Sequence, residues 1–192
     1  MAKINILDSS VFNRIAAGEV VDRPYSVVKE FVENSIDAGA TSISIEIERG
    51  GKDRICVSDN GSGIEREDFT SAFLPHATSK IARVEDLDVI MTLGFRGEAL
   101  ASIASVANVT VKSRAAGGDC AYQISCSGGK MGEILPCARD VGTEICAENL
   151  FFNTPVRAKF LKSDKGEEAE ITNSVSRFIL GNPEISFRYF VD

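Results

Sequence analysis

The stretch EFVENSIDAGA places acid and amide side chains at a spacing that could serve chemistry. Glu30, Asn34 and Asp37 follow one another at intervals of four and three residues. On a helix these side chains would share one narrow stripe, because positions three and four apart are neighbours. Carboxylate and amide oxygens can bind a hard cation such as Mg²⁺, and a carboxylate can take a proton from water. A solvated helix face has the same pattern, so other motifs must decide between the two interpretations.

A second candidate is DNGSGI, Asp59–Ile64, which directly follows a stretch that predicts a strand. A calcium loop is excluded because its twelfth position would be Thr70 instead of glutamate and its sixth is not glycine. A dinucleotide motif is excluded because its third glycine would fall at Arg66. Two interpretations remain, a plain turn and an adenine pocket. In the pocket, the carboxylate would accept the exocyclic amine, and Gly61 and Gly63 would let the backbone approach the ring.

A third candidate is GFRGEAL, Gly94–Leu100, at the predicted start of a helix. Small residues before a helix expose unpaired N–H groups, and the helix dipole favours anions there. Arg96 adds a forked positive charge that suits phosphate. The chain contains no G-x-x-x-x-G-K-[ST] motif. This stretch alone therefore indicates either a phosphate contact or an ordinary glycine-rich helix start.

Hydrophobic periodicity predicts the elements that must position these residues. Helices are expected over 9–18, over 23–39 with Ser26 as a possible cap, over 98–107, over 153–161, and from about 164 to 180. Strands are expected as a pair within 41–59, then over 108–114, 120–126, 132–138, 143–149 and 184–192. This order predicts an α+β fold, a two-layer α/β sandwich whose mixed, mostly antiparallel sheet carries helices on one face.

Length and composition limit the possible classes of protein. The chain has 192 residues, which predicts one domain, and its net charge is 21 − 28 = −7. An acidic chain is not expected to hold DNA through phosphate contacts alone. No apolar run approaches the ~18 residues of a membrane span, and MAKINILDSS lacks the features of a secretory signal, so we expect no membrane association and no secretion. The five cysteines form no C-x-x-C pair and His76 is the only histidine, which predicts free thiols and no Cys/His metal site.

Taken in order, the three motifs resemble those of the GHKL ATPases, a superfamily that includes gyrase, certain chaperones and histidine kinases. Within that superfamily the sequence is most similar to the MutL mismatch-repair family. The segments that carry the similarity are IAAGEVVDRP, VENSIDAGAT, HATSKI, LGFRGEALASI and FFNTPVRAKFL. The resemblance extends from Ile4 to about Phe190 and implies the GHKL, or Bergerat, ATP-binding fold.

The resemblance implies that the stripe on the first helix lines an ATP pocket. Asn34 would be the Mg²⁺ ligand, and Glu30 would be the general base that positions and deprotonates the attacking water. Ala38 would leave room beside that base by being small. Asp37 is expected to be structural, because it also lies in the last turn of the helix.

The remaining site residues follow from the same resemblance. Asp59 would read the adenine, with Thr143 near the same contact and Gly61, Gly63 and Ile64 shaping the wall. The segment from about Phe73 to Leu100 resembles a mobile lid, in which Thr78 and Lys80 would approach the nucleotide. Backbone N–H groups for the phosphates would come from the glycine-rich run, Gly94, Phe95, Arg96, Gly97, Glu98, Ala99 and Leu100.

The function implied is slow, Mg²⁺-dependent ATP hydrolysis that drives dimerisation of N-terminal regions in DNA mismatch repair. Expected partners are ATP, a mismatch-recognition protein, a downstream nuclease or helicase, and a second subunit in a homo- or heterodimer. DNA contact is expected to be weak and mainly through parts outside this chain. The basic run Arg157, Lys159, Lys162 and Lys165 could touch phosphate, but its composition favours a solvated helix. The location would be cytoplasmic in a bacterium and nuclear in a eukaryote.

Two alternatives remain beside this interpretation. The last predicted strand is expected to lead into a second domain that supplies a lysine to the terminal phosphate. Without that lysine, the chain could be an ATP-gated binding module that does not hydrolyse ATP. A histidine kinase would need a phospho-acceptor histidine, and His76 in the lid is a poor candidate.

Overall fold

The computed structural model describes residues 21–75 and 98–192. The helices are α2 (Pro24–Asp37), α3 (Ala99–Val106), α4 (Pro155–Lys159) and α5 (Asp164–Gly181), with short 3₁₀ turns η1 (Arg49–Gly51), η2 (Arg66–Asp68) and η3 (Ser71–Phe73). The strands are β1 (Ser42–Glu48), β2 (Arg54–Asp59), β3 (Asn108–Arg114), β4 (Ala121–Ser127), β5 (Lys130–Met131), β6 (Leu135–Cys137), β7 (Gly142–Glu148) and β8 (Ser186–Val191). The helix predicted over 9–18 lies outside the described residues.

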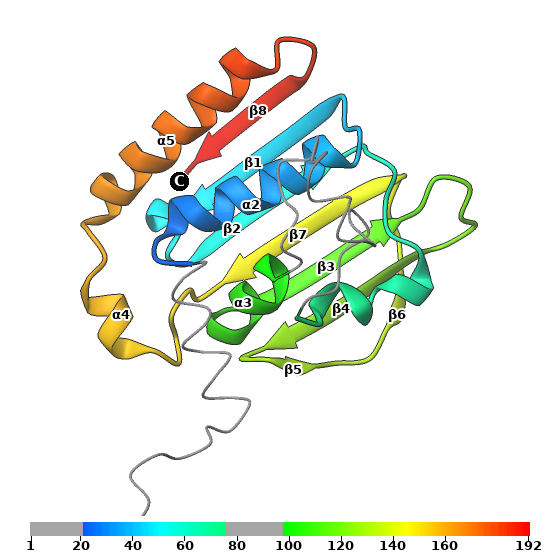
Figure 1. Cartoon of the computed structure of the whole chain (residues 1–192), viewed down its shortest axis with the longest axis horizontal. Helices are drawn as coiled ribbons and strands as arrows, with labels where there is room; N and C mark the ends of the chain where they lie inside the picture. The colour runs from blue at the N-terminus through cyan, green and yellow to red at the C-terminus, as the bar shows by residue number, and fades with distance from the viewer. Residues whose placement is uncertain (1–20, 76–97) are drawn as a thin grey trace, which may run out of the picture.

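The strands form one sheet in the order β5-β4-β3-β7-β2-β1-β8, with β6 pairing with β4 (Figure 1). In the part of the chain that the structure describes, β1 and β8 form the only parallel pair. The predicted mixed, mostly antiparallel sheet is therefore confirmed. β7 lies in the middle and joins β2 to β3.

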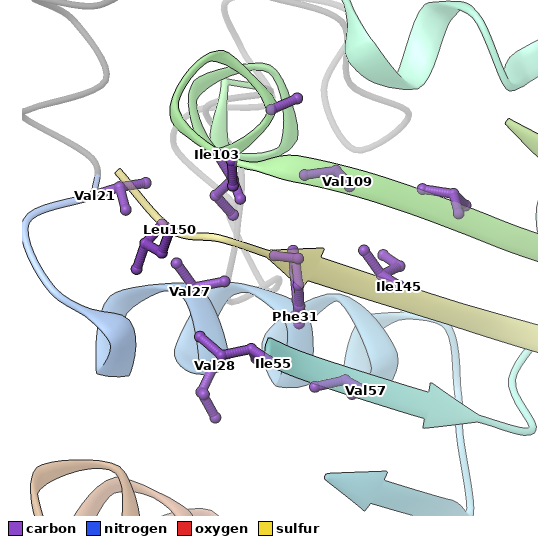
Figure 2. Packing of buried hydrophobic residues seen from close by; sticks show 14 of the residues in the cluster. Val21, Val27, Val28, Phe31, Ile55, Val57, Ile103, Val109, Ile145 and Leu150 are labelled. Atoms are coloured by element: carbon purple, nitrogen blue, oxygen red, sulfur yellow. The ribbon is translucent and has the colours of Figure 1, made fainter. Parts of the chain in front are cut away.

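The hydrophobic core lies between the sheet and a layer of helices on one of its faces. Figure 1 shows α2, α3 and α5 on the same side of the sheet. Val27 and Phe31 of α2 and Ile103 of α3 point toward one another above β2 and β7 in Figure 2, and all three are at most 1% exposed. In β1, buried isoleucines alternate with half-buried polar residues, so that one face of the strand meets the helices. The structure thus has the predicted two-layer α/β architecture.

The first described helix begins close to the start predicted at residue 23, but its N-cap differs from the expected one. α2 starts at Pro24 with Arg23 as N-cap, so the expected cap at Ser26 is wrong. Proline suits the first helical position because its missing N–H would be unpaired there in any case. The Ser26 hydroxyl donates instead to the Asp22 carboxylate at 2.5 Å. Among the described helices, none combines the length and apolar character needed to cross a membrane.

Two further differences concern the strands. The strand predicted over 132–138 is reduced to β6, because Pro136 has no N–H for a ladder and the segment lies at an edge of the sheet. Cys56 of β2 lies opposite Cys146 of β7, and the two are joined by a disulfide. The expectation of free thiols is therefore wrong for this pair. Two residues 90 positions apart become neighbours only through strand register, which spacing does not reveal.

Candidate nucleotide-binding site

Asp59, at the end of β2, is the buried acid at the centre of the site. Its side chain is 9% exposed, so its oxygens must be satisfied by the protein. Oδ1 accepts from the backbone N–H groups of Gly61 at 2.9 Å and Thr143 at 3.1 Å. Oδ2 accepts from the Ser35 hydroxyl at 2.8 Å. Three elements, α2, β2 and β7, thus hold this carboxylate in one orientation.

A count of lone pairs shows what Asp59 can still bind. Each carboxylate oxygen can accept about two hydrogen bonds. Oδ1 has two donors, whereas Oδ2 has one, the hydroxyl of Ser35. Within the described residues, the carboxylate therefore has one acceptor position left, on Oδ2. A buried carboxylate with one remaining acceptor position suits a ligand that offers a single N–H donor.

The glycines beside Asp59 are required by close backbone contacts. A Cβ at Gly61 would lie 2.8 Å from the Ala38 carbonyl oxygen and 2.9 Å from the Ala38 Cβ. Gly63 has φ +74°, and a Cβ there would lie 2.1 Å from the Arg114 carbonyl oxygen. These separations leave no room for a side chain. The loop after β2 is consequently fixed against the end of α2 on one side and the end of β3 on the other.

Ser113 fixes the other wall of the site. It is fully buried in β3, its hydroxyl accepts from the Ile64 N–H at 2.8 Å, and it lies 2.9 Å from both the Gly142 carbonyl and the Thr143 hydroxyl. Neither Ser113 nor Ser35 was among the site residues predicted from the sequence. The signal for Ser113 was present, because a serine stands at an inward position of the alternating strand NVTVKSR. Ser35 carried no comparable signal among the polar residues of α2.

The predicted stripe lies on α2, the helix that Ser35 joins to this carboxylate. Ser35 binds Asp59 and stands between Asn34 and Ile36, so it fixes that turn of α2 against the end of β2. Asn34 and Asp37 are half-buried. The Glu30 side chain is 23% exposed, and its Oε1 lies 3.8 Å from Lys29 Nζ. The stripe is thus partly solvated and is flanked by one cation.

Lys29 is shared between two carboxylates. Its Nζ donates to Glu33 Oε2 at 2.9 Å, in addition to its contact with Glu30. Desolvation lowers the pKa of Lys29, but the hydrogen bond and charge of Glu33, together with the charge of Glu30, raise it, and the net shift is upward. Lys29 therefore stays positive at neutral pH and places one cation beside two acids of α2.

The structure brings together most of the predicted residues that it describes. Ala38, Asp59, Gly61, Gly63, Ile64 and Thr143 form one connected cluster through the contacts above. Glu98 is the N-cap of α3, and Ala99 and Leu100 form its first turn, as the sequence predicts. Thr78, Lys80, Gly94, Phe95, Arg96 and Gly97 lie outside the described residues. The roles assigned to all these residues stay predictions.

Comparison with known proteins gives the class of this chain. A family profile described as "Histidine kinase-, DNA gyrase B-, and HSP90-like ATPase" matches residues 23–133. The chain therefore belongs to this family of ATPases. Its match begins at Arg23, beside the first residue of α2, and includes the loop that follows Asp59.

Within this family, the proteins that the chain matches along almost its whole length are MutL proteins. It is 54% identical over 186 residues to the DNA mismatch repair protein MutL of Clostridium acetobutylicum, covering 97% of the chain and 30% of that protein. It is 53% identical over 190 residues to MutL of Clostridium botulinum strain Eklund 17B, covering 99% of the chain and 28% of that protein. The chain thus spans less than a third of these relatives.

A solved structure supports the same placement. The Aquifex aeolicus MutL ATPase domain complexed with ADP superposes with a TM-score of 0.72 and is 34% identical. The match covers 90% of this chain and 61% of that one. The expected GHKL fold and the similarity to MutL are both confirmed.

Proposed function

We propose that this chain binds ATP with its adenine against Asp59. The observation that carries the proposal is the single remaining acceptor position on the buried Oδ2. The exocyclic amine of adenine offers an N–H donor to such a position, and Gly61 and Gly63 leave the backbone close to the ring. The ADP complex of the Aquifex aeolicus domain supports a nucleotide as ligand.

The donor set on α2 fits a magnesium ion. Glu30 and Asn34 offer oxygen ligands from one helix face, next to the turn fixed by Ser35, and Mg²⁺ prefers oxygen ligands. One or two protein oxygens suffice, because Mg²⁺ keeps waters and takes phosphate oxygens for its other positions. Asn34 is the residue that would hold it. When bound, Mg²⁺ neutralises charge on the phosphates.

Glu30 is the residue that would take the proton from the attacking water. A general base in the correct position contributes typically about 10²–10⁴-fold to the rate. The Glu30 side chain is 23% exposed, so water can reach this carboxylate, and Lys29 Nζ lies 3.8 Å from its Oε1. The neutral amide of Asn34, one turn along α2, leaves Glu30 as the proton acceptor of the pair.

We further propose that ATP binding and hydrolysis time the assembly of a MutL-type mismatch-repair protein. ATP would draw two N-terminal regions together, and hydrolysis would release them. The protein would then act as a matchmaker between a mismatch-recognition protein and a downstream nuclease or helicase. The similarity to MutL over 97% of this chain supports this role.

The test of ligand binding is a titration with a non-hydrolysable ATP analogue and Mg²⁺. The wild-type chain should bind saturably, and Asn34→Ala should lose the Mg²⁺-dependent part of the affinity. Asn173→Ala is the matched control, because Asn173 is an exposed helical asparagine on α5. Failure of the wild type to bind in any buffer would refute the proposal.

The test of hydrolysis uses the longer protein that contains this chain. Glu30→Ala should bind ATP and fail to turn it over, because the base is removed while the pocket is kept. Unchanged turnover would refute the assignment of Glu30. Binding without turnover in the 192-residue chain, together with turnover in the longer protein, would show that this chain alone is an ATP-gated binding module.

A further inference from the structure

The disulfide lies on the face of the sheet that the helices do not cover. Cys56 stands between Ile55 and Val57, which point into the core, and neighbouring side chains on a strand point to opposite faces. Cys146 occupies the equivalent position in β7. Cys56 is 4% exposed, whereas Cys146 is half-buried. A reagent in solution therefore reaches the sulfur of Cys146 more easily than that of Cys56.

Arg54 favours a reactive thiolate at Cys146 in the reduced protein, whereas the Glu144 carboxylate opposes it. Arg54 Nη2 lies 4.0 Å from the Cys146 sulfur. A neighbouring guanidinium stabilises the thiolate, which is the form that attacks disulfides. Arg54 is itself held by Glu46 at 3.0 Å and Glu48 at 3.5 Å, so its charge stays beside the sulfur.

A chain of contacts joins this pair to the candidate site. The Glu144 carboxylate lies within 4.8 Å of both sulfurs. Its Oε2 is 3.4 Å from Arg139 Nη1. The other amino group of Arg139, Nη2, donates to the carbonyl of Asp59 at 3.1 Å. Glu144 and Arg139 thus connect the surroundings of the disulfide to the backbone of Asp59 through one ion pair and one hydrogen bond.

We propose that Cys56 and Cys146 form a reversible redox site whose state sets the rigidity of the Asp59–Thr143 contact. The oxidant is a low-molecular-weight disulfide. The Cys146 thiolate attacks one of its sulfurs, forming a mixed disulfide and releasing one small thiolate. Cys56 then loses its proton and attacks the Cys146 sulfur, which releases the second small thiolate. Two protein thiols are oxidised, and one small disulfide is reduced to two small thiols.

Reduction alters the contacts that reach Asp59. Breaking the bond removes the covalent tie between β2 and β7 and forces two unbonded sulfurs apart. A thiolate at Cys146 also repels the Glu144 carboxylate, which holds Arg139. A metal site formed by Cys56, Cys146 and Glu144 is a weaker interpretation of this cluster than a redox pair. The Glu144 carboxylate is already engaged by Lys112 at 3.0 Å and by Arg139 at 3.4 Å. We therefore expect the ends of the two strands, with Asp59 and Thr143, to become less rigid.

The first experiment measures the redox equilibrium and the strand contact together. The 192-residue chain is equilibrated in glutathione buffers, blocked with iodoacetamide and weighed by mass spectrometry. Five blocked cysteines are expected in reducing buffer and three in oxidising buffer, with a two-electron transition between them. Hydrogen exchange of the peptide containing Thr143 should be about tenfold faster in the reduced state, because local opening costs less free energy there.

The results that would overturn the proposal are equally specific. A pair that stays bonded, or stays reduced, in every glutathione buffer is not a reversible site. Equal exchange of the Thr143 peptide in both states would refute the coupling. Cys146→Ser should exchange like the reduced protein in all buffers. Cys120→Ser is the matched control, because Cys120 is an exposed free thiol, and it should leave the transition unchanged.

Two variants test the residues that carry the mechanism. Arg54→Gln should react with oxidised glutathione about fivefold more slowly at neutral pH, because less Cys146 is then ionised. Arg139→Gln should keep the redox transition and show a smaller difference in Thr143 exchange, because only the loss of the covalent tie then separates the two states. A wild-type rate in the first variant, or an undiminished difference in the second, would contradict the assigned path.

The expected effect of reducing the disulfide on ATP binding rests on the proposed function. We expect the reduced chain to bind the ATP analogue about fivefold more weakly, at the low end of usual coupling between sites. Equal affinity in both states would refute this effect. If neither state binds the analogue, the proposed function fails, and hydrogen exchange still decides the redox proposal.

Discussion

Replacing Asp59 by asparagine tests the adenine contact with little change in shape. Because Oδ1 receives two backbone N–H groups, the amide oxygen of the variant must take that position. The NH₂ group then replaces Oδ2 and faces the Ser35 hydroxyl. That hydroxyl can turn its proton to the Phe31 carbonyl, 3.1 Å away, and accept from the new amide. We therefore expect the free energy of unfolding to fall by only about 0.5–1.5 kcal/mol.

The same exchange should weaken ATP binding far more. On the proposed function, the remaining acceptor position on Oδ2 of the wild type receives the adenine amine, whereas in Asp59→Asn two N–H donors would face each other. A hydrogen bond to a charged group contributes about 1.5–3 kcal/mol. This corresponds to a loss of affinity of roughly 10- to 160-fold, since about 1.4 kcal/mol is tenfold. Loss in this range, with the fold kept, is the expected result.

A second ligand isolates the contact itself. The triphosphate of purine riboside lacks the exocyclic amine, so the wild type should prefer ATP to it, and Asp59→Asn should not. Calorimetric titration of both proteins with both ligands completes the cycle. Asp53→Asn makes the same charge change at a carboxylate that is 46% exposed, and should behave as wild type. A variant that keeps the preference for the amine would refute the assignment of Asp59 as the adenine acceptor.

Two further predictions concern stability. Gly142→Ala should lower the free energy of unfolding, measured in urea, by at least about 3 kcal/mol. Its φ is +121°, and a Cβ there would lie 2.1 Å from the Asp59 carbonyl oxygen. The control Gly117→Ala, with φ +89° and nothing within 4 Å, should lose only about 1–2 kcal/mol. The hydrogen bond from Lys52 lowers the pKa of Asp164 in the folded protein below its ordinary value of 3.8. The ionised carboxylate therefore stabilises the fold above pH 3.8, and this stabilisation is lost as the pH falls through the lowered pKa. Asp164→Asn should therefore lose less stability than wild type as the pH is lowered below about 4. Equal losses, followed by circular dichroism, would contradict this.

The local elements could be predicted from the sequence because their signals are local. Alternating Ile43, Ile45 and Ile47 predicted β1, and the periodic apolar residues of α2 predicted that helix, as the structure confirms. The order of the sheet could not be predicted in this way. It depends on β7 entering between β2 and β3, and each strand carries an alternating pattern that would suit several neighbours.

The residues of the candidate site that lie in sequence motifs could be predicted, whereas the residues that support them could not. Asp59 and its glycines stood in a recognisable motif, and Thr143 followed from the family resemblance. The supporting hydroxyls did not, because Ser35 and Ser113 act through partners 24 and 30 residues away in sequence. The disulfide between Cys56 and Cys146 could not be predicted for the same reason. Contacts that depend on the register between strands cannot be recognised from the spacing of residues along the chain.

The position of β7 has a consequence for the order in which the protein folds during synthesis. β1 with β2, and β3 with β4, are pairs of neighbours along the chain, so each can form soon after it leaves the ribosome. An isolated pair of strands is marginally stable, and its open edges can pair with other molecules. Until the seven residues of β7 emerge, the nascent chain therefore carries two separate units instead of one sheet, the β1–β2 pair and the strands β3 to β6, each with an open edge. We expect chaperone dependence to be greatest in that interval and to end when β7 joins the two units.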